Sequence, residues 1–187
     1  MDQSAEFKLN GYLYLKDLLP RDSCIELAKG LKVLVDEKKT TKDHQCPKSE
    51  AIGGSAIFNS LLGDLTPRFE TITGLKLYPT YSYARFYDSQ NEELKIHLDR
   101  PSCEISISLT LDFEGEVWPL CLGHKGDKSD SVAYKMNIGD GLMYRGLEIY
   151  HWREPYKEGK WQAQVFLHYV DQNGPHAEWK YDKHESL

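Results

Sequence analysis

A histidine and an aspartate two positions apart are the residues in this chain best suited to bind a metal ion. His97 and Asp99 precede the segment 105–111, whose alternating side chains predict a β-strand. On an extended backbone, residues i and i+2 project to the same face, so an imidazole nitrogen and a carboxylate oxygen can reach one point. A second histidine would complete the two-histidine, one-carboxylate set that binds non-haem Fe(II). His151 is the candidate, because the separation of about fifty residues leaves room for several strands and a loop.

The His-x-Asp spacing has little weight by itself. The chain contains seven His and 14 Asp residues, so chance alone places roughly half of one such pair in it. The sequence His-Ala-Glu at 176–178 has a similar form, but too few residues follow it to return a third ligand. The alternatives to a metal site are a hydrogen-bonded His151 beside a tryptophan and an Asp99 that caps a turn before a proline. We favour the metal because the three residues occur together with the features below.

Length and composition predict one domain spanning residues 1–187. The chain is 40% apolar and 12% aromatic, which is enough to bury a sizeable core and too apolar for a disordered protein. The net charge of −6, with scattered Lys and Arg, indicates neither a nucleic-acid groove nor a membrane-binding patch. No apolar stretch has membrane-spanning length and the first residues lack a signal-peptide pattern, so we expect a cytoplasmic protein, with monomer or homodimer undecided. The cysteines have no CxxC spacing, which predicts free buried thiols and disfavours zinc: Cys24, Cys46, Cys103 and Cys121.

The period of the apolar residues separates a helical first part from a strand-rich remainder. The first part is expected to contain a strand at 7–15 with a turn at Asn10-Gly11, a helix from Asp22 or Ser23 to about Glu37, a loop at 38–55, a helix at 56–62, and a helix from Thr66 to Gly74. Strands are expected at 75–78, 81–87, 94–98, 104–113, 131–137, 141–145 and 161–170.

This order of elements predicts a mainly β fold with flanking helices, an antiparallel double-stranded β-helix (jelly roll). The helical buttress would span about 20–74 and the jelly-roll core about 75–171. The polar tail at 172–187 holds Trp179 and Tyr181, so we expect it to fold back onto the body.

An oxygenase with such an iron site would need an electron-donating cosubstrate. A 2-oxo acid would chelate the iron at one end, and its distal carboxylate would then need a fixed cation inside the barrel. Lys160 lies nine residues after His151 and shares a strand face with Gln162 and Gln164. A buried Lys is costly unless an anion pairs with it. The equally weighted alternative is a Lys on an edge strand that faces water.

A second polar face is expected on the strand at 81–87. A tyrosine hydroxyl there could bond the cosubstrate carboxylate, and Arg85 could hold cosubstrate or a substrate anion. The alternative is a core tyrosine stripe with Arg85 at the rim. Trp152 is a candidate wall of the site. Three arginines flank the presumed iron ligands, and both substrate binding and loop salt bridges stay open for them: Arg100, Arg145 and Arg153.

Taken together, these pieces resemble the Fe(II)/2-oxoglutarate-dependent dioxygenases, and within them the prolyl 4-hydroxylase group. The matching pieces extend from about residue 7 to 171. They are Asn10-Gly11-Tyr12, Leu18-Leu19-Pro20, Ala84-Arg85-Phe86-Tyr87, His97-Leu98-Asp99, Leu109-Thr110-Leu111-Asp112, Gly139-Asp140 and Gly159-Lys160-Trp161. Their joint order is far more specific than any one piece.

The resemblance implies a role for several residues. His97, Asp99 and His151 would bind Fe(II), with no catalytic group beyond these ligands. Lys160 would bind the distal carboxylate of 2-oxoglutarate, as a Lys before Trp does in collagen-type prolyl hydroxylases. The same pocket would be lined by Tyr83, Tyr87 and Gln164, and the substrate candidates are Arg85, Arg100, Arg153 and Trp152. Thr110 stands where many relatives have Tyr, so the hydrogen bonds to the cosubstrate are expected to differ.

The activity implied by the resemblance is hydroxylation coupled to decarboxylation of 2-oxoglutarate to succinate and CO₂. O₂ is the oxidant, and ascorbate is a candidate reductant. The substrate would be a peptidyl or free amino acid such as proline, and the loops 38–55 and 88–96 would select it. Because halogenases of this fold lack the carboxylate ligand, Asp99 favours hydroxylation. The alternatives are a small-metabolite hydroxylase of the same superfamily and a metal-binding jelly roll without turnover.

Overall fold

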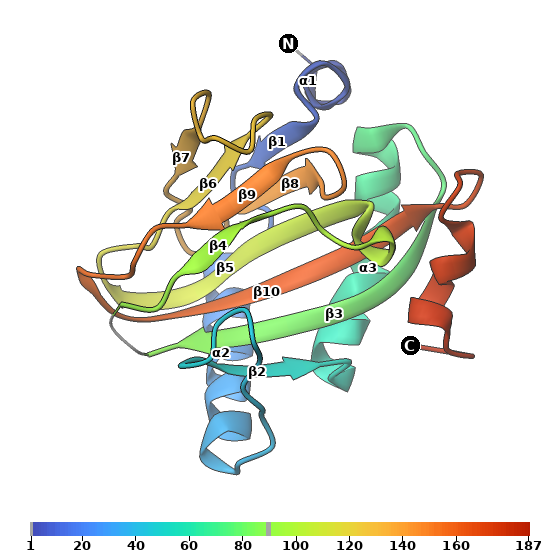
Figure 1. Ribbon diagram of the computed structural model, residues 1–187. Coiled ribbons are helices and arrows are strands. Elements are labelled where there is room, and N and C mark those ends of the chain that lie inside the picture. Colours follow the sequence, from blue (N-terminus) through green and yellow to red (C-terminus); the bar gives the residue numbers. More distant parts are fainter. Residues whose placement is uncertain (1, 89–90) are drawn as a thin grey trace.

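Two antiparallel sheets face each other, and the helices cover the outer face of the larger sheet (Figure 1). The structure is a computed structural model that describes residues 2–88 and 91–187. The six-stranded sheet has the order β1-β8-β5-β10-β3-β2, and the four-stranded sheet has the order β4-β9-β6-β7. This is the predicted double-stranded β-helix with a helical buttress.

The elements have the following bounds. The helices are α1 (Gln3–Asn10), α2 (Arg21–Asp36) and α3 (Ala56–Thr73), with 3₁₀ turns at η1 (Pro101–Cys103) and η2 (Ala177–Lys183). The strands are β1 (Tyr12–Leu15), β2 (Glu50–Gly53), β3 (Leu77–Tyr87), β4 (Leu94–His97), β5 (Ile105–Gly115), β6 (Leu120–Gly123), β7 (Val132–Tyr134), β8 (Gly141–Arg145), β9 (Tyr150–Arg153) and β10 (Gly159–Asp171).

Alternation along β10 separates an apolar layer from a polar interior. Every second residue joins the core beneath α2 and α3: Ala163, Val165, Leu167 and Tyr169. On the other face of the strand, Gln162, Gln164 and His168 are buried. The apolar layer supplies most of the stabilisation, because burying each large apolar side chain contributes about 1.5–3 kcal/mol. The polar side chains of the other face are therefore not needed for core packing and can line a site between the sheets.

The start of the chain is a helix, so the strand predicted at 7–15 is wrong in its first half. Residues Gln3–Asn10 form α1, and Gly11 ends it in the left-handed conformation (φ +73°) while donating its N–H to the Phe7 carbonyl. Phe7 is fully buried in the main core. Only the last four residues of the predicted strand, β1, pair with β8.

The two helices predicted at 56–62 and 66–74 are one helix, α3. Pro67 lies inside it and removes one backbone hydrogen bond, yet Leu62 and Phe69 on either side are both fully buried. Packing of this continuous apolar face outweighs the local break. Gly74 ends the helix in the left-handed conformation, at the predicted position.

Helix α2 also departs from prediction at its start. It follows Pro20 directly, and neither Asp22 nor Ser23 caps it.

Several strands differ from prediction because tertiary pairing decides them. The predicted loop at 38–55 contains β2, which pairs with β3 and forms the edge of the larger sheet. The segments 75–78 and 81–87 form the single strand β3, which runs through Pro79 opposite a register shift in β10. The short strands β6 and β9 were not predicted, although both pair within the smaller sheet.

The tail folds back as expected. Arg100 forms an ion pair with Asp182 (2.8 Å), and its guanidinium lies over the Trp179 ring. All four cysteines are free and buried, also as expected. In the part of the chain that the structure describes, no helix has both the length and the apolar character needed to span a membrane.

Candidate metal centre

The pairing of β4 with β9 brings the three predicted ligands together. His97 and His151 are direct cross-strand partners, and their ring centroids are 4.2 Å apart. The Oδ1 atom of Asp99 lies 3.3 Å from Nε2 of His151 and 3.7 Å from Nε2 of His97. All three ligand atoms lie within 4.8 Å of one another, so one ion can contact them all. This arrangement is the facial set of two imidazoles and one carboxylate.

Backbone carbonyls orient both imidazoles. Nδ1 of His97 lies 2.8 Å from the Lys95 carbonyl oxygen, and Nδ1 of His151 lies 3.1 Å from the Ile149 carbonyl oxygen. Because a carbonyl only accepts, each Nδ1 carries the proton and each Nε2 keeps its lone pair for the metal.

A short hydrogen-bond chain holds the carboxylate. The Ser106 hydroxyl donates to Oδ2 of Asp99 (2.9 Å), and Nδ1 of His168 lies 2.9 Å from that hydroxyl. The backbone N–H of Asp99 donates to the Gly146 carbonyl (2.8 Å). Oδ2 is thus engaged, and Oδ1 is left facing the two imidazoles. Asp99, Cys103 and His168 form a second close group, but Cys103 and His168 are themselves hydrogen-bonded, to Tyr81 and Ser106.

The protonation states suit metal binding. Burial raises the pKa of Asp99, but the neighbouring His151 and the hydrogen bond from Ser106 bring that pKa below its ordinary value. Burial, followed by the nearby His151, lowers the pKa of His97. A carboxylate beside a neutral imidazole is the state that ligates a cation.

Gly146 is a site residue that the sequence reasoning missed. An added Cβ there would lie 2.5 Å from Oδ2 of Asp99 and would overlap the Cys103 carbonyl. Only glycine fits against the carboxylate. A lone glycine shortly before His151 was the one available signal, and sequence does not show what it touches.

The expectation that Lys160 faces the interior is wrong. Its side chain is 71% exposed and pairs with Glu114 on the neighbouring strand β5. Strict alternation would place Lys160 on the face of Gln162, but a register shift between Gly159 and Trp161 interrupts the alternation at this end of β10. Lys160 therefore faces water, as in the alternative, but it does so from a strand that lies between β5 and β3 and is not at the edge of the sheet.

The other predicted cosubstrate residues do lie between the sheets. The Gln164 amide donates to the Thr110 hydroxyl (2.9 Å), so Thr110 takes part in this polar layer. The Tyr83 hydroxyl donates to Asp43, a residue of the loop before β2. Burial and this bond raise the pKa of Tyr83 to about 12. Tyr87 is fully buried, and its hydroxyl has no hydrogen-bond partner among the described residues.

The four substrate candidates have different environments. Arg85 is buried and pairs with Asp43. Arg153 is also buried, two residues after His151 on β9. The structure does not bring the other two to the ligands. Arg100 is engaged by the tail, and Trp152 projects from the opposite face of β9 to His151, where its indole N–H donates to Glu154.

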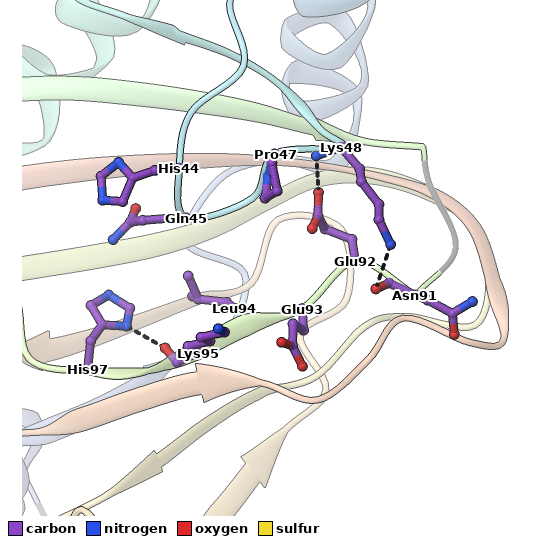
Figure 2. A pocket seen from close by; sticks show the side chains of 10 residues that line it. All are labelled: His44, Gln45, Pro47, Lys48, Asn91, Glu92, Glu93, Leu94, Lys95 and His97. Carbon is purple, nitrogen blue, oxygen red and sulfur yellow. Dashed lines mark hydrogen bonds between the residues drawn. The ribbon is translucent and has the colours of Figure 1, made fainter.

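A cavity of about 480 Å³ opens beside His97 (Figure 2). Two loops form it, one before β2 and one before β4, and Glu92 ties them together by accepting the backbone N–H of Lys48 (2.8 Å) and the Ser49 hydroxyl (2.9 Å). The lining residues are His44, Gln45, Pro47, Lys48, Asn91, Glu92, Glu93, Leu94, Lys95 and His97. These loops fall in the segments predicted to select substrate, 38–55 and 88–96, of which residues 89 and 90 lie outside the described residues.

Comparison with known proteins identifies the fold. No family model matches the chain, and no curated protein matches it. Among solved structures, a Pseudomonas putida prolyl-4-hydroxylase matches with a TM-score of 0.71 at 14% identity, over 91% of this chain and 99% of the other. The epimerase SnoN from nogalamycin biosynthesis, solved with Fe³⁺, α-ketoglutarate and nogalamycin RO, matches with a TM-score of 0.75 at 11% identity, over 90% of this chain and 82% of the other. HygX from Streptomyces hygroscopicus, solved with nickel and 2-oxoglutarate, matches with a TM-score of 0.71 at 11% identity, over 91% and 87%. The chain therefore has the double-stranded β-helix fold of the 2-oxoglutarate and iron-dependent oxygenases.

Proposed function

We propose that this protein is an Fe(II)- and 2-oxoglutarate-dependent oxygenase that hydroxylates an amino acid, free or within a peptide. The observation that carries the proposal is the convergence of Nε2 of His97, Oδ1 of Asp99 and Nε2 of His151 on one point. Three ligands on one side of an ion leave its remaining positions open for cosubstrate and O₂. The fold shared with oxygenases that bind iron or 2-oxoglutarate supports the same reading.

The residues of the chain divide the work. Backbone carbonyls orient the imidazoles of His97 and His151, and Ser106 orients the Asp99 carboxylate. These side chains would therefore bind a metal ion without changing their orientation. When bound, the iron centre with its cosubstrate supplies the oxidising power to cleave a C–H bond. The buried polar layer between the sheets excludes bulk water from the side of the site that faces the interior.

The cavity beside His97 is the proposed substrate site. Its volume of about 480 Å³ is in the usual range for pockets that bind small molecules or one side chain of a peptide. Its walls mix cations, carboxylates and amides, which suits a substrate with both charged and polar groups.

The test is an anaerobic titration of the purified protein with Fe(II) and 2-oxoglutarate, followed by turnover with O₂. We expect a visible charge-transfer band that Asp99→Ala abolishes, and succinate release that depends on substrate. A gain of one oxygen atom by the substrate supports hydroxylation. Succinate with an unchanged product mass points to epimerisation, the activity named for SnoN. If the protein binds metal but forms no succinate with a peptide library or a metabolite extract, it is a metal-binding module without catalytic activity. Failure to bind metal refutes the proposal.

A further inference from the structure

Arg153 is a buried cation without a counter-charge. Its residue exposure is 1%, and its one hydrogen bond within the described chain runs from Nη1 to the Trp118 carbonyl. The Nε and Nη2 atoms are buried and have no hydrogen-bond partner among residues 2–88 and 91–187. A buried guanidinium is costly unless an anion compensates it, so this environment is incomplete as it stands.

The other buried arginine does not share this feature. The Arg85 guanidinium also lies near the Tyr87 ring, and Asp43 already neutralises its charge. Nε of Arg85 is also buried without a hydrogen-bond partner among the described residues, so the feature that separates the two guanidinium groups is the carboxylate counter-charge, which Arg85 has and Arg153 lacks in the described part of the chain.

Arg153 provides the buried cation between the sheets that Lys160 was expected to provide. The inward-facing residue at this end of β10 is Gln162, which is neutral and fully buried. The Gln162 amide (3.4 Å) and the Arg153 guanidinium both donate to the same atom, the Trp118 carbonyl oxygen. The cation that β10 lacks at this level is therefore supplied by β9.

Two further donors lie nearby. The hydroxyls of Tyr87 and Tyr156 are buried without hydrogen-bond partners in the described part of the chain. The rings of both contact Trp118, at centroid distances of 4.9 Å, and the Arg153 guanidinium lies 5.2 Å from that indole. A carboxylate placed among them would accept hydrogen bonds from groups that otherwise have none.

We infer that Arg153, rather than Lys160, binds the distal carboxylate of the 2-oxo acid cosubstrate. This inference rests on the proposed function. Arg153 and His151 project from the same face of β9, about 7 Å apart along the strand. A five-carbon dicarboxylate that chelates a metal at His151 extends its far end over a comparable distance. The forked guanidinium suits bidentate binding of that carboxylate.

The experiment compares two 2-oxo acids that differ only at the distal end. Protein loaded anaerobically with Fe(II) is titrated with 2-oxoglutarate and with 2-oxopentanoate, which lacks the distal carboxylate, and the charge-transfer band reports each Kd. We expect wild type to prefer 2-oxoglutarate by about 100-fold or more. Arg153→Gln should reduce that preference to a few-fold, while Lys160→Gln should retain it.

The outcomes separate the inference from the proposed function. If neither acid gives a band with wild type, the proposed function fails. If wild type binds 2-oxoglutarate but Arg153→Gln keeps the full preference, or if Arg85→Gln or Lys160→Gln alone removes it, the inference is wrong and the function stands.

A folding control accompanies the titration. Because Arg153→Gln removes an uncompensated buried charge, its unfolding temperature without ligand should equal or exceed that of wild type. Added 2-oxoglutarate should then raise the unfolding temperature of Fe(II)-loaded wild type more than that of the variant. If Arg153→Gln does not fold, Arg153→Lys keeps the charge and should show an intermediate preference; an unchanged preference in that variant would contradict a bidentate role.

Discussion

Replacing Gly146 with alanine should weaken metal binding as well as the fold. The added Cβ would lie 2.5 Å from Oδ2 and 2.9 Å from Cβ of Asp99, well inside ordinary carbon contact distances of about 3.5–4.0 Å. The backbone at Gly146 cannot retreat easily, because its N–H donates to Glu104 (3.0 Å) and its carbonyl accepts from Asp99 (2.8 Å). The Asp99 carboxylate and the Cys103 carbonyl, which the Cβ would also overlap, must therefore move.

The magnitude follows from two separate costs. Overpacking of a fixed site destabilises by about 1–3 kcal/mol. In a chain of this length that corresponds to a fall in Tm of roughly 2–12 °C. Displacing the metal-facing carboxylate should cost about 10- to 100-fold in affinity, the usual effect of disturbing a group that orients a ligand.

The assay is Co(II) binding by visible absorption together with thermal unfolding of the metal-free protein. Gly63→Ala is the matched control, because a Cβ on Gly63 meets nothing within 4 Å and alanine favours the helix by about 0.5–1 kcal/mol. The control should bind Co(II) like wild type with an equal or higher Tm. Wild-type Co(II) affinity in Gly146→Ala would refute the argument that this glycine positions Asp99.

Three further predictions concern the loop, the core and the thiols. Asp43→Asn should lower the free energy of unfolding at pH 7 by about 1–3 kcal/mol, since it leaves Arg85 unpaired. Burial raises the pKa of Asp43, but Tyr83 and Arg85 bring it below its ordinary value, so the extra stability of wild type is present above the pKa of the unfolded state and is lost as the pH falls through the pKa of the folded state. Urea unfolding that gives the same difference between wild type and variant at pH 7 and at pH 2 would contradict this. Phe69→Ala should cost about 3–5 kcal/mol, because the fully buried ring packs edge-on against Tyr169 at 5.5 Å, and a loss below 1 kcal/mol in the same unfolding assay would show that α3 is not packed as described. The native protein should react slowly with a thiol reagent at pH 8 and give four thiols when denatured, because burial raises the pKa of Cys24 and of Cys46 to about 11, and rapid native labelling of either would argue against their burial.

Residue type and spacing were sufficient to name the candidate metal ligands and the type of fold. His97 and Asp99 could be recognised because side-chain direction on an extended backbone depends only on spacing. The alternation from residue 75 onward likewise predicted a β-rich core, and the β8 bounds, Gly141–Arg145, coincide with the predicted strand. His151 was a candidate because its separation from His97 leaves room for several strands, and the pairing of β4 with β9 places it opposite His97.

Pairing and packing decided the rest. The direction of Lys160 depends on a register shift against β5, and the continuity of α3 through Pro67 depends on the sheet beneath it. The importance of Gly146 and Arg153 comes from neighbours distant in the chain: a carboxylate that leaves no room for a Cβ, and a carbonyl that engages one guanidinium nitrogen while others stay unpaired. Sequence determines which chemical groups are present and which alternate together. Only the tertiary structure determines which of them are buried without a partner, because burial and pairing are properties of contacts between segments.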